Sequence, residues 1–315
     1  MTDHRKDYAF TATTLKQRTH DEAMYSGALS FCRRAFARDL AGVDVAVMGV
    51  PLDTTVTNRP GTRFGPRAVR AASTQLAWSR AWPSAFDPFE RLAVADWGDV
   101  AFDPGRPGET PAIIEAAISS VLEEAKAALV IGGDHFTTYP ALRAAAKKHG
   151  GPLALVQFDA HTDTWQDEGD RVEHGTMFWR AVREGLIDPA HSVQIGIRTT
   201  NDDPLGITVI DAIRCHRSTP EEVAAEALRV VGGRPAYLTF DIDALDPSCA
   251  PGTGTPVCGG LFSWQALAML RALKGLNLVG MDVVEVSPPY DHAEITALAG
   301  ATVALEMLCL YAVRP

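Results

Sequence analysis

Short runs of apolar, often β-branched residues recur along the chain, and longer stretches with a 3.6-residue apolar period lie between many of them. The short runs predict β-strands and the periodic stretches predict α-helices. Helix start signals support this reading, as at Thr219-Pro220-Glu221-Glu222, where a capping residue precedes a proline and two acids. The predicted strands lie at 44–53, 90–100, 127–135, 152–163, 191–198, 207–211, 235–243 and 277–286, and the predicted helices at 111–128, 140–149, 176–184, 220–231 and 263–273.

Strands that alternate with helices predict a mainly parallel sheet covered by helices on both faces. We therefore expect an α/β fold, a three-layer α-β-α sandwich around a sheet of about eight strands. No low-complexity linker divides residues 41–315, so this range is predicted to be one catalytic domain. The polar, mixed residues 1–40 are predicted to form an N-terminal arm on the surface or against a neighbouring subunit. The apolar segment 295–313 contains Glu306, which favours a core helix over a membrane span.

Composition excludes several classes of protein. The 315 residues carry 29 Lys and Arg against 39 Asp and Glu, a net charge of −10, and no basic stripe of the kind that binds nucleic acid. The five cysteines are scattered and form no CxxC pair, which is typical of reduced thiols in a cytoplasmic protein. The N-terminus has no apolar signal region. The sequence predicts a cytoplasmic protein with neither nucleic-acid nor membrane partners.

Polar residues in alternation follow one of the predicted buried strands. Asp159, His161 and Asp163 stand two residues apart, so their side chains share one face if the strand geometry continues. Two carboxylates that close repel each other unless a proton or a cation lies between them. A capped strand end with turn aspartates and a structural histidine is the alternative, and the triple alternation disfavours it.

Three other predicted strands also run into acids or histidines. Ligands of open α/β sheets bind at the carboxyl ends of the strands, so these residues are expected to meet at one edge. The strand at 127–133 leads to His135, the strand at 236–240 to Asp241 and Asp243, and the strand at 278–284 to Glu285.

The chemistry of this set points to metal ions. The four aspartates bring a charge of −4, which two divalent cations would cancel. All six expected ligands offer oxygen or nitrogen and none offers sulfur, which favours a hard metal such as Mn²⁺ and leaves zinc, cobalt and nickel open. Two neighbouring ions need carboxylates that bridge them. The expected ligands are His135, Asp159, His161, Asp163, Asp241 and Asp243.

The motifs that contain these residues resemble those of the ureohydrolases, the arginase and agmatinase family. GGDH (132–135), DAHTD (159–163) and DIDALDP (241–247) look like the family's three metal-binding signatures. The likeness runs from about residue 44 to the C-terminus and is greatest to bacterial agmatinases. It extends to GTRFGPRAVR (61–70), HGTMF (174–178), SVQIGIR (192–198), APGTGTP (250–256) and MDVVEVSPPYD (281–291).

The resemblance implies an arginase-like fold and two Mn²⁺ ions per subunit. One ion would be bound by His135 and Asp163, the other by His161 and Asp243, and Asp159 and Asp241 would bridge them. Family members usually form trimers or hexamers, so a homo-oligomer is expected.

The resemblance also implies a reaction, the hydrolysis of a linear amidine by a hydroxide that bridges the two ions and attacks the guanidinium carbon. Glu285 matches the acid that holds the substrate guanidinium, and His174 matches a mobile proton-shuttling histidine. Taken alone, His174 fits a helix start equally well. An agmatinase would release putrescine and urea from agmatine.

The loop after the second motif bears on the substrate. Trp165 cannot bind a carboxylate through its single indole N–H, and the loop 165–173 contains four acids and one arginine. An amine tail such as that of agmatine suits this loop better than a carboxylate tail. The alternative is a guanidinobutyrase or another guanidino-acid ureohydrolase, whose carboxylate would be bound by Arg171 or by an N-terminal loop residue, Asn58 or Arg59. A mononuclear zinc deacetylase of related fold and a non-catalytic family member are the remaining alternatives.

Overall fold

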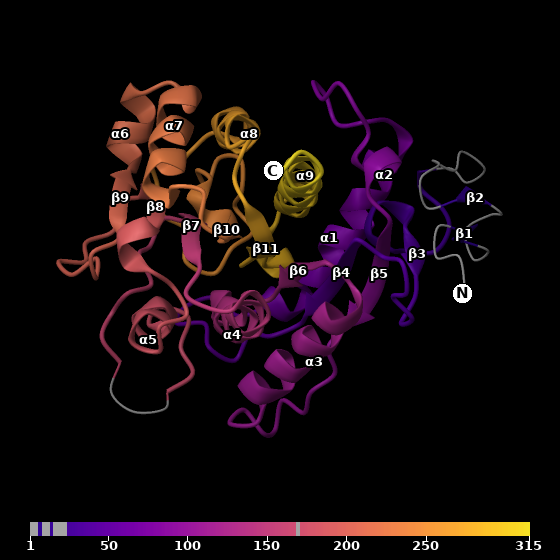
Figure 1. The fold of residues 1–315 in the computed structure, drawn as a ribbon, viewed down its shortest axis with the longest axis horizontal. Coiled ribbons are helices and arrows are strands. Elements are labelled where there is room, and N and C mark those ends of the chain that lie inside the picture. Colours follow the sequence, from indigo (N-terminus) through magenta and orange to yellow (C-terminus); the bar gives the residue numbers. More distant parts are fainter. Residues whose placement is uncertain (1–5, 8–12, 15–23, 168–170) are drawn as a thin grey trace.

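The computed structural model describes residues 6–7, 13–14, 24–167 and 171–315, and in these ranges a nine-stranded sheet runs through the centre of the molecule (Figure 1). Every strand pair in this sheet is parallel, and the strand order is β3-β5-β4-β6-β11-β10-β7-β8-β9. All eight predicted strands are present. The strands are β3 (Ala35–Phe36), β4 (Val45–Val50), β5 (Val94–Asp99), β6 (Ala127–Gly132), β7 (Ala154–Phe158), β8 (Val193–Ile197), β9 (Thr208–Asp211), β10 (Ala236–Asp241) and β11 (Leu278–Val284), with a separate antiparallel pair of β1 (Lys6–Asp7) and β2 (Thr13–Thr14).

Helices cover both faces of the sheet, which confirms the three-layer α-β-α sandwich (Figure 1). One layer contains α3 (Thr110–Glu124), α4 (Thr138–His149) and α5 (Met177–Arg183). The other contains α1 (Gly65–Ser73), α2 (Pro88–Arg91), α6 (Ala212–Arg217), α7 (Pro220–Val231), α8 (Ser263–Ala272) and α9 (Ile295–Tyr311). Short 3₁₀ turns lie at η1 (Phe31–Arg33), η2 (Thr62–Phe64), η3 (Thr74–Trp78), η4 (His135–Thr137), η5 (Pro189–His191), η6 (Ile242–Ala244) and η7 (Pro288–Tyr290).

The strands are apolar on both sides because each face packs against a helical layer. In β4, Val45 and Val47 belong to the core under α1 and α9, while Ala46 and Met48 belong to the core under α3 and α4. Successive side chains of a strand point to opposite faces, so one strand supplies both cores. A continuous apolar run is therefore the expected sequence of a strand inside a parallel sheet.

The predicted core helix at the C-terminus is α9, and its one acid is satisfied. Glu306 is 4% exposed, and its Oε1 accepts a hydrogen bond from Nε of Arg271 on α8 at 3.0 Å. The neighbouring α7 has the predicted start, with a reciprocal capping box between Thr219 and Glu222. In the described part of the chain, no helix is both long and apolar enough to cross a membrane.

The predicted arm of residues 1–40 differs from the structure where that segment is described. Residues 1–5, 8–12 and 15–23 lie outside the described ranges, but Phe31 and Cys32 are fully buried and β3 forms an edge strand of the main sheet. The Phe31 N–H also donates to Asp96 Oδ2 of β5 at 2.8 Å. Part of the segment predicted as an arm thus packs against the core, because a few apolar residues among arginines are enough to join it.

Candidate metal centre

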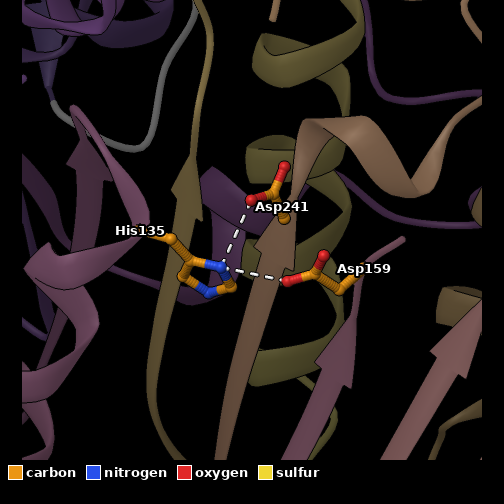
Figure 2. A group of neighbouring side chains, drawn as sticks. All are labelled: His135, Asp159 and Asp241. Atoms are coloured by element: carbon orange, nitrogen blue, oxygen red, sulfur yellow. Dashed lines mark ion pairs between the residues drawn. The ribbon is translucent and has the colours of Figure 1, made fainter. Parts of the chain in front are cut away.

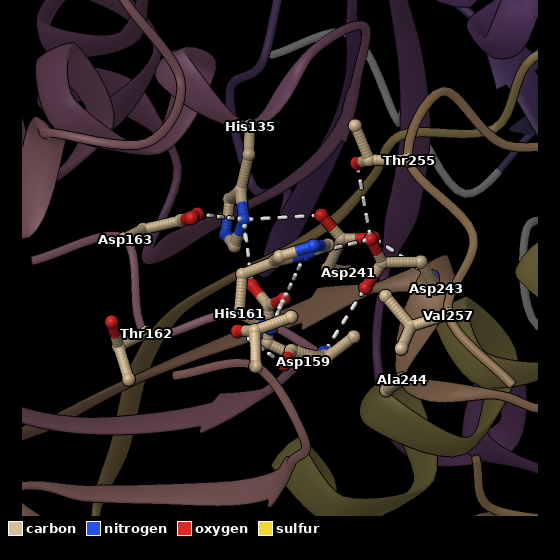
Figure 3. A network of polar contacts seen from close by, with 12 residues as sticks. His135, Asp159, His161, Thr162, Asp163, Asp241, Asp243, Ala244, Thr255 and Val257 are labelled. Carbon is tan, nitrogen blue, oxygen red and sulfur yellow. Dashed lines mark hydrogen bonds and ion pairs between the residues drawn. The ribbon is translucent and has the colours of Figure 1, made fainter. Parts of the chain in front are cut away.

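The predicted site residues gather at the carboxyl ends of four strands that are neighbours in the sheet, β6, β11, β10 and β7 (Figure 3). Parallel strands bring their carboxyl ends to the same edge, so segments more than a hundred residues apart meet there. His135 begins η4 after β6, Asp159 follows β7, Asp241 ends β10, Asp243 lies in η6, and Glu285 follows β11.

Three carboxylates surround one nitrogen of His135. Its Nδ1 lies 3.0 Å from Asp159 Oδ2, 2.9 Å from Asp163 Oδ2 and 3.2 Å from Asp241 Oδ2, and it has no hydrogen-bond partner (Figures 2 and 3). The other ring nitrogen, Nε2, lies 2.9 Å from Thr239 Oγ1. When Nε2 donates its proton to that hydroxyl, Nδ1 keeps a lone pair directed at the carboxylates, which is how a ligand histidine is held.

A second cluster forms around His161 and shares one carboxylate with the first. His161 Nδ1 lies 3.1 Å from Asp243 Oδ2 and 3.5 Å from Asp159 Oδ1. Asp159 thus turns one oxygen to each histidine, and the structure contains two three-residue groups with metal-ligand spacing. The groups are His135, Asp159 and Asp241, and Asp159, His161 and Asp243.

The charges of this site call for a cation. Burial raises the pKa of Asp163 to about 6, helped by the charge of Asp159, and it raises the pKa of Asp241 well above its ordinary value. Burial opposes the protonated His161 ring, yet the carboxylates of Asp243 and Asp159 raise the pKa of His161 to about 12. The polypeptide alone can hold so many buried acids only by keeping protons among them. Divalent cations would replace those protons, so the donor set fits two such ions.

The predicted alternation is not what brings Asp159, His161 and Asp163 together. The strand β7 ends at Phe158, and the three residues lie in the bend beyond it, where Asp163 has a positive φ of 51°. Glu285 has a positive φ as well, 64°. Residues with a side chain rarely adopt this conformation, and such strain is concentrated at functional sites.

Glu285 lies behind His174, away from the cavity. Glu285 is fully buried; its Oε1 accepts from the His135 backbone N–H at 2.8 Å and lies 2.8 Å from His174 Nδ1. Its Oε2 is buried without a hydrogen-bond partner. Burial alone would lower the pKa of His174, but the charge of Glu285 and the hydrogen bond to it raise that pKa to about 9.

Thr57 faces the other nitrogen of the same ring. His174 Nε2 lies 3.2 Å from the Thr57 backbone N–H and 3.0 Å from Thr57 Oγ1. A neutral ring can accept from the N–H, and a protonated ring can donate to the hydroxyl. Thr57 is therefore a partner for both protonation states of His174.

A cavity of about 130 Å³ lies beside the two clusters. His174 forms part of its wall, together with ligands of both clusters, and among the described residues no Arg or Lys does. The lining residues are Thr57, His161, Asp163, Trp165, Glu173, His174, Gly175, Asp241 and Thr255.

The acids of the 165–173 loop have different roles. Asp167 is buried and accepts from Arg180 Nε at 2.6 Å, so it holds the loop to α5. Glu173 lines the cavity. Glu168 and Asp170 lie outside the described residues.

The residues expected to bind the carboxylate of a guanidino acid, Asn58, Arg59 and Arg171, do not line the cavity. Arg59 stacks over Tyr290, with 5.3 Å between the guanidinium carbon and the ring centroid. Asn58 donates to the Gly254 carbonyl at 3.2 Å, and Arg171 pairs with Glu173.

Several site residues were not expected from the sequence. Thr57 and Thr239 gave no signal, because a threonine in a loop, like Thr57, or inside a strand, like Thr239, is ordinary. Gln157 is fully buried in β7, and its Nε2 donates to Asp159 Oδ2 at 2.7 Å. A lone amide inside an apolar strand was the signal that could have identified it, since buried polar groups need partners.

Comparison with known proteins decides the family. Residues 43–309 match the Arginase family, a span that contains every residue of both clusters. The chain belongs to the arginase family. The two clusters and Glu285 thus lie within the part of the chain that matches the family.

Individual relatives of this arginase-family chain are similar over most of their length. A curated agmatinase from Chromobacterium violaceum is 57% identical over 92% of this chain and 90% of its own. The crystal structure of a hypothetical agmatinase from Burkholderia thailandensis is 54% identical, has a TM-score of 0.94 and covers 98% of this chain and 96% of its own. The structure of the proclavaminate amidino hydrolase of Streptomyces clavuligerus is 40% identical and has a TM-score of 0.89. The match covers 92% of this chain and 99% of that chain.

Proposed function

We propose that this arginase-family enzyme is an agmatinase, which hydrolyses agmatine to the diamine putrescine and urea. The observation that carries the proposal is the cavity beside the two clusters, whose wall contains acids and, among the described residues, no Arg or Lys. A substrate with a cation at each end suits such a wall, whereas a guanidino acid would place its carboxylate among acids. The identity of 57% to a curated agmatinase supports the same substrate.

We propose that the two clusters hold two divalent metal ions, with Mn²⁺ as the physiological metal. Oxygen and imidazole nitrogen donors without sulfur support that metal. His135 and Asp163 would hold one ion, and His161 and Asp243 would hold the other. Asp159 and Asp241 would contact both ions. Such ions, when bound, lower the pKa of water and so supply hydroxide near neutral pH. Two clusters that share Asp159 disfavour the mononuclear zinc deacetylase.

Glu285 and His174 would act on the substrate itself. A guanidinium is a planar cation with several N–H donors, and Glu285 Oε2 is a buried acceptor without a partner. Because His174 stands between Glu285 and the cavity, the ring must move away from Glu285 Oε1 for the guanidinium to reach it. A protonated His174 that moves in this way can deliver its proton to the departing amine.

We also propose a homo-oligomer, a trimer or hexamer, in the cytoplasm. The family resemblance supports the assembly, and light scattering after gel filtration would measure its mass. Cys215, Cys249, Cys258 and Cys309 are free thiols, as in proteins of reducing compartments.

The test of the proposed function is urea release by the Mn²⁺-loaded protein with agmatine, 4-guanidinobutyrate and L-arginine in parallel. A strong preference for agmatine is expected. A preference for 4-guanidinobutyrate would keep the metal centre and contradict the agmatine assignment. No urea from any of the three would contradict the proposed activity.

A further inference from the structure

One part of the cavity wall has no role in holding metal. Trp165, Glu173 and Gly175 line the same cavity as the expected ligands His161 and Asp163, but none of the three belongs to either cluster. Glu173 immediately precedes His174 in the chain. A substrate held by its guanidinium near His174 therefore extends along a wall that contains an indole and a carboxylate.

Trp165 is fixed in this wall by its packing. Its backbone N–H donates to the Gly175 carbonyl at 3.2 Å, and its indole lies so close to Gly175 that a side chain there would approach Cε3 to 3.1 Å. The indole centroid lies 6.5 Å from that of His161. The wall next to the second cluster is thus a flat apolar surface, which suits methylene groups and also attracts cations.

Glu173 presents a carboxylate that is only partly neutralised. Its side chain is 23% exposed, and its Oε2 pairs with Arg171 Nη2 at 2.7 Å, while Arg171 itself is 68% exposed. A carboxylate has about four acceptor positions and can bind a second cation while it keeps the first. An arginine that exposed is held weakly and can give way to a substrate ammonium.

We propose that Glu173 is a specificity-determining residue that binds the terminal ammonium of agmatine, with Trp165 packed against the methylene chain. This inference rests on the proposed agmatinase function. It assigns the preference for a cationic substrate tail to one acid of the 165–173 loop. Asp167, the other acid of that loop that the structure describes, is already paired with Arg180. The interaction is a charge-assisted hydrogen bond between ammonium and carboxylate.

The experiment compares two substrates that differ only at the tail. Agmatine and 1-butylguanidine share the guanidinium and the four-carbon chain, but 1-butylguanidine lacks the ammonium. In Glu173→Gln, the KM for agmatine is expected to rise about tenfold with kcat little changed, since a charged hydrogen bond at a half-buried position is lost. Hydrolysis of 1-butylguanidine by the same variant is expected to change less than about twofold.

Arg171→Gln is the matched control, because it breaks the same ion pair and leaves the acid in place. If Glu173 acts only by holding the loop through Arg171, both variants will raise the agmatine KM alike, and the inference is overturned. An equal effect of Glu173→Gln on both substrates, or none on either, overturns it as well. If the wild-type protein releases no urea from agmatine, the proposed agmatinase function is contradicted. That result is distinguishable from a failure of the Glu173 proposal, in which the wild type is active and only the variants behave differently from expectation.

Discussion

Gln194 donates from Nε2 to Gln157 Oε1 at 2.7 Å, and this bond determines which end of the Gln157 amide faces the metal centre. With its oxygen engaged, Gln157 turns its nitrogen to Asp159 and donates to Oδ2 at 2.7 Å. Both glutamines are fully buried. The pair therefore presents a donor to the shared carboxylate, which favours its ionised form and its orientation toward both histidines.

Replacing Gln157 by Leu is expected to weaken metal binding about ten- to a hundredfold, as is usual when a partner of a metal ligand is removed. Competition with a chromophoric chelator measures the Mn²⁺ affinity, and the thermal midpoint of the metal-free variant shows whether the fold survives. Gln194→Leu leaves Gln157 in place but frees its amide to turn, so a smaller loss is expected. Unchanged affinity in Gln157→Leu would contradict the role of this pair.

Metal removal is expected to lower the melting temperature of the protein, and the size of this change is expected to depend on Asp241. Ions that bind only the folded state stabilise it by about 4 kcal/mol at a thousandfold excess over Kd, so Mn²⁺ should raise the melting temperature and EDTA should lower it. Burial and the neighbouring carboxylates raise the pKa of Asp241, which favours its protonated, uncharged form in the metal-free protein. Asp241→Asn should thus melt close to wild type in EDTA and gain little from Mn²⁺. An equal gain in both proteins would argue against Asp241 as a ligand.

The ring of His174 should titrate near pH 9 in the metal-free protein. Burial lowers its pKa, but Glu285 more than compensates, and the value rises from an ordinary 6.5 to about 9. Because the folded-state pKa is raised, the stabilisation is fully present below pH 6.5 and is lost as the pH rises through 9. NMR of the imidazole nitrogens measures the pKa directly.

Glu285→Gln is expected to lower the His174 pKa in that titration, since it removes the charge that faces Nδ1. Added Mn²⁺ should lower it too, because cations nearby disfavour the protonated ring. A His174 pKa that neither change moves would mean that Glu285 does not control this proton.

Local pattern predicted eight of the nine strands of the main sheet and a set of candidate metal ligands. Strands between helices are recognisable because a parallel sheet buried on both faces needs apolar runs, and all eight predicted strands are present. Asp159, Asp241 and Asp243 could be identified because they follow such runs directly, at the end of a strand where ligands bind.

Only the tertiary structure decided which of these residues face one another. The strand order places β11 and β10 between β6 and β7, so His135 meets Asp159 across two intervening strands, a contact that depends on chain topology rather than local sequence. The same packing separates two acids of one loop, Asp167 against Arg180 and Glu173 in the cavity wall. It also places His174 in front of Glu285. Residue type defines what a side chain can bind, but its partner is whatever the folded chain brings within reach.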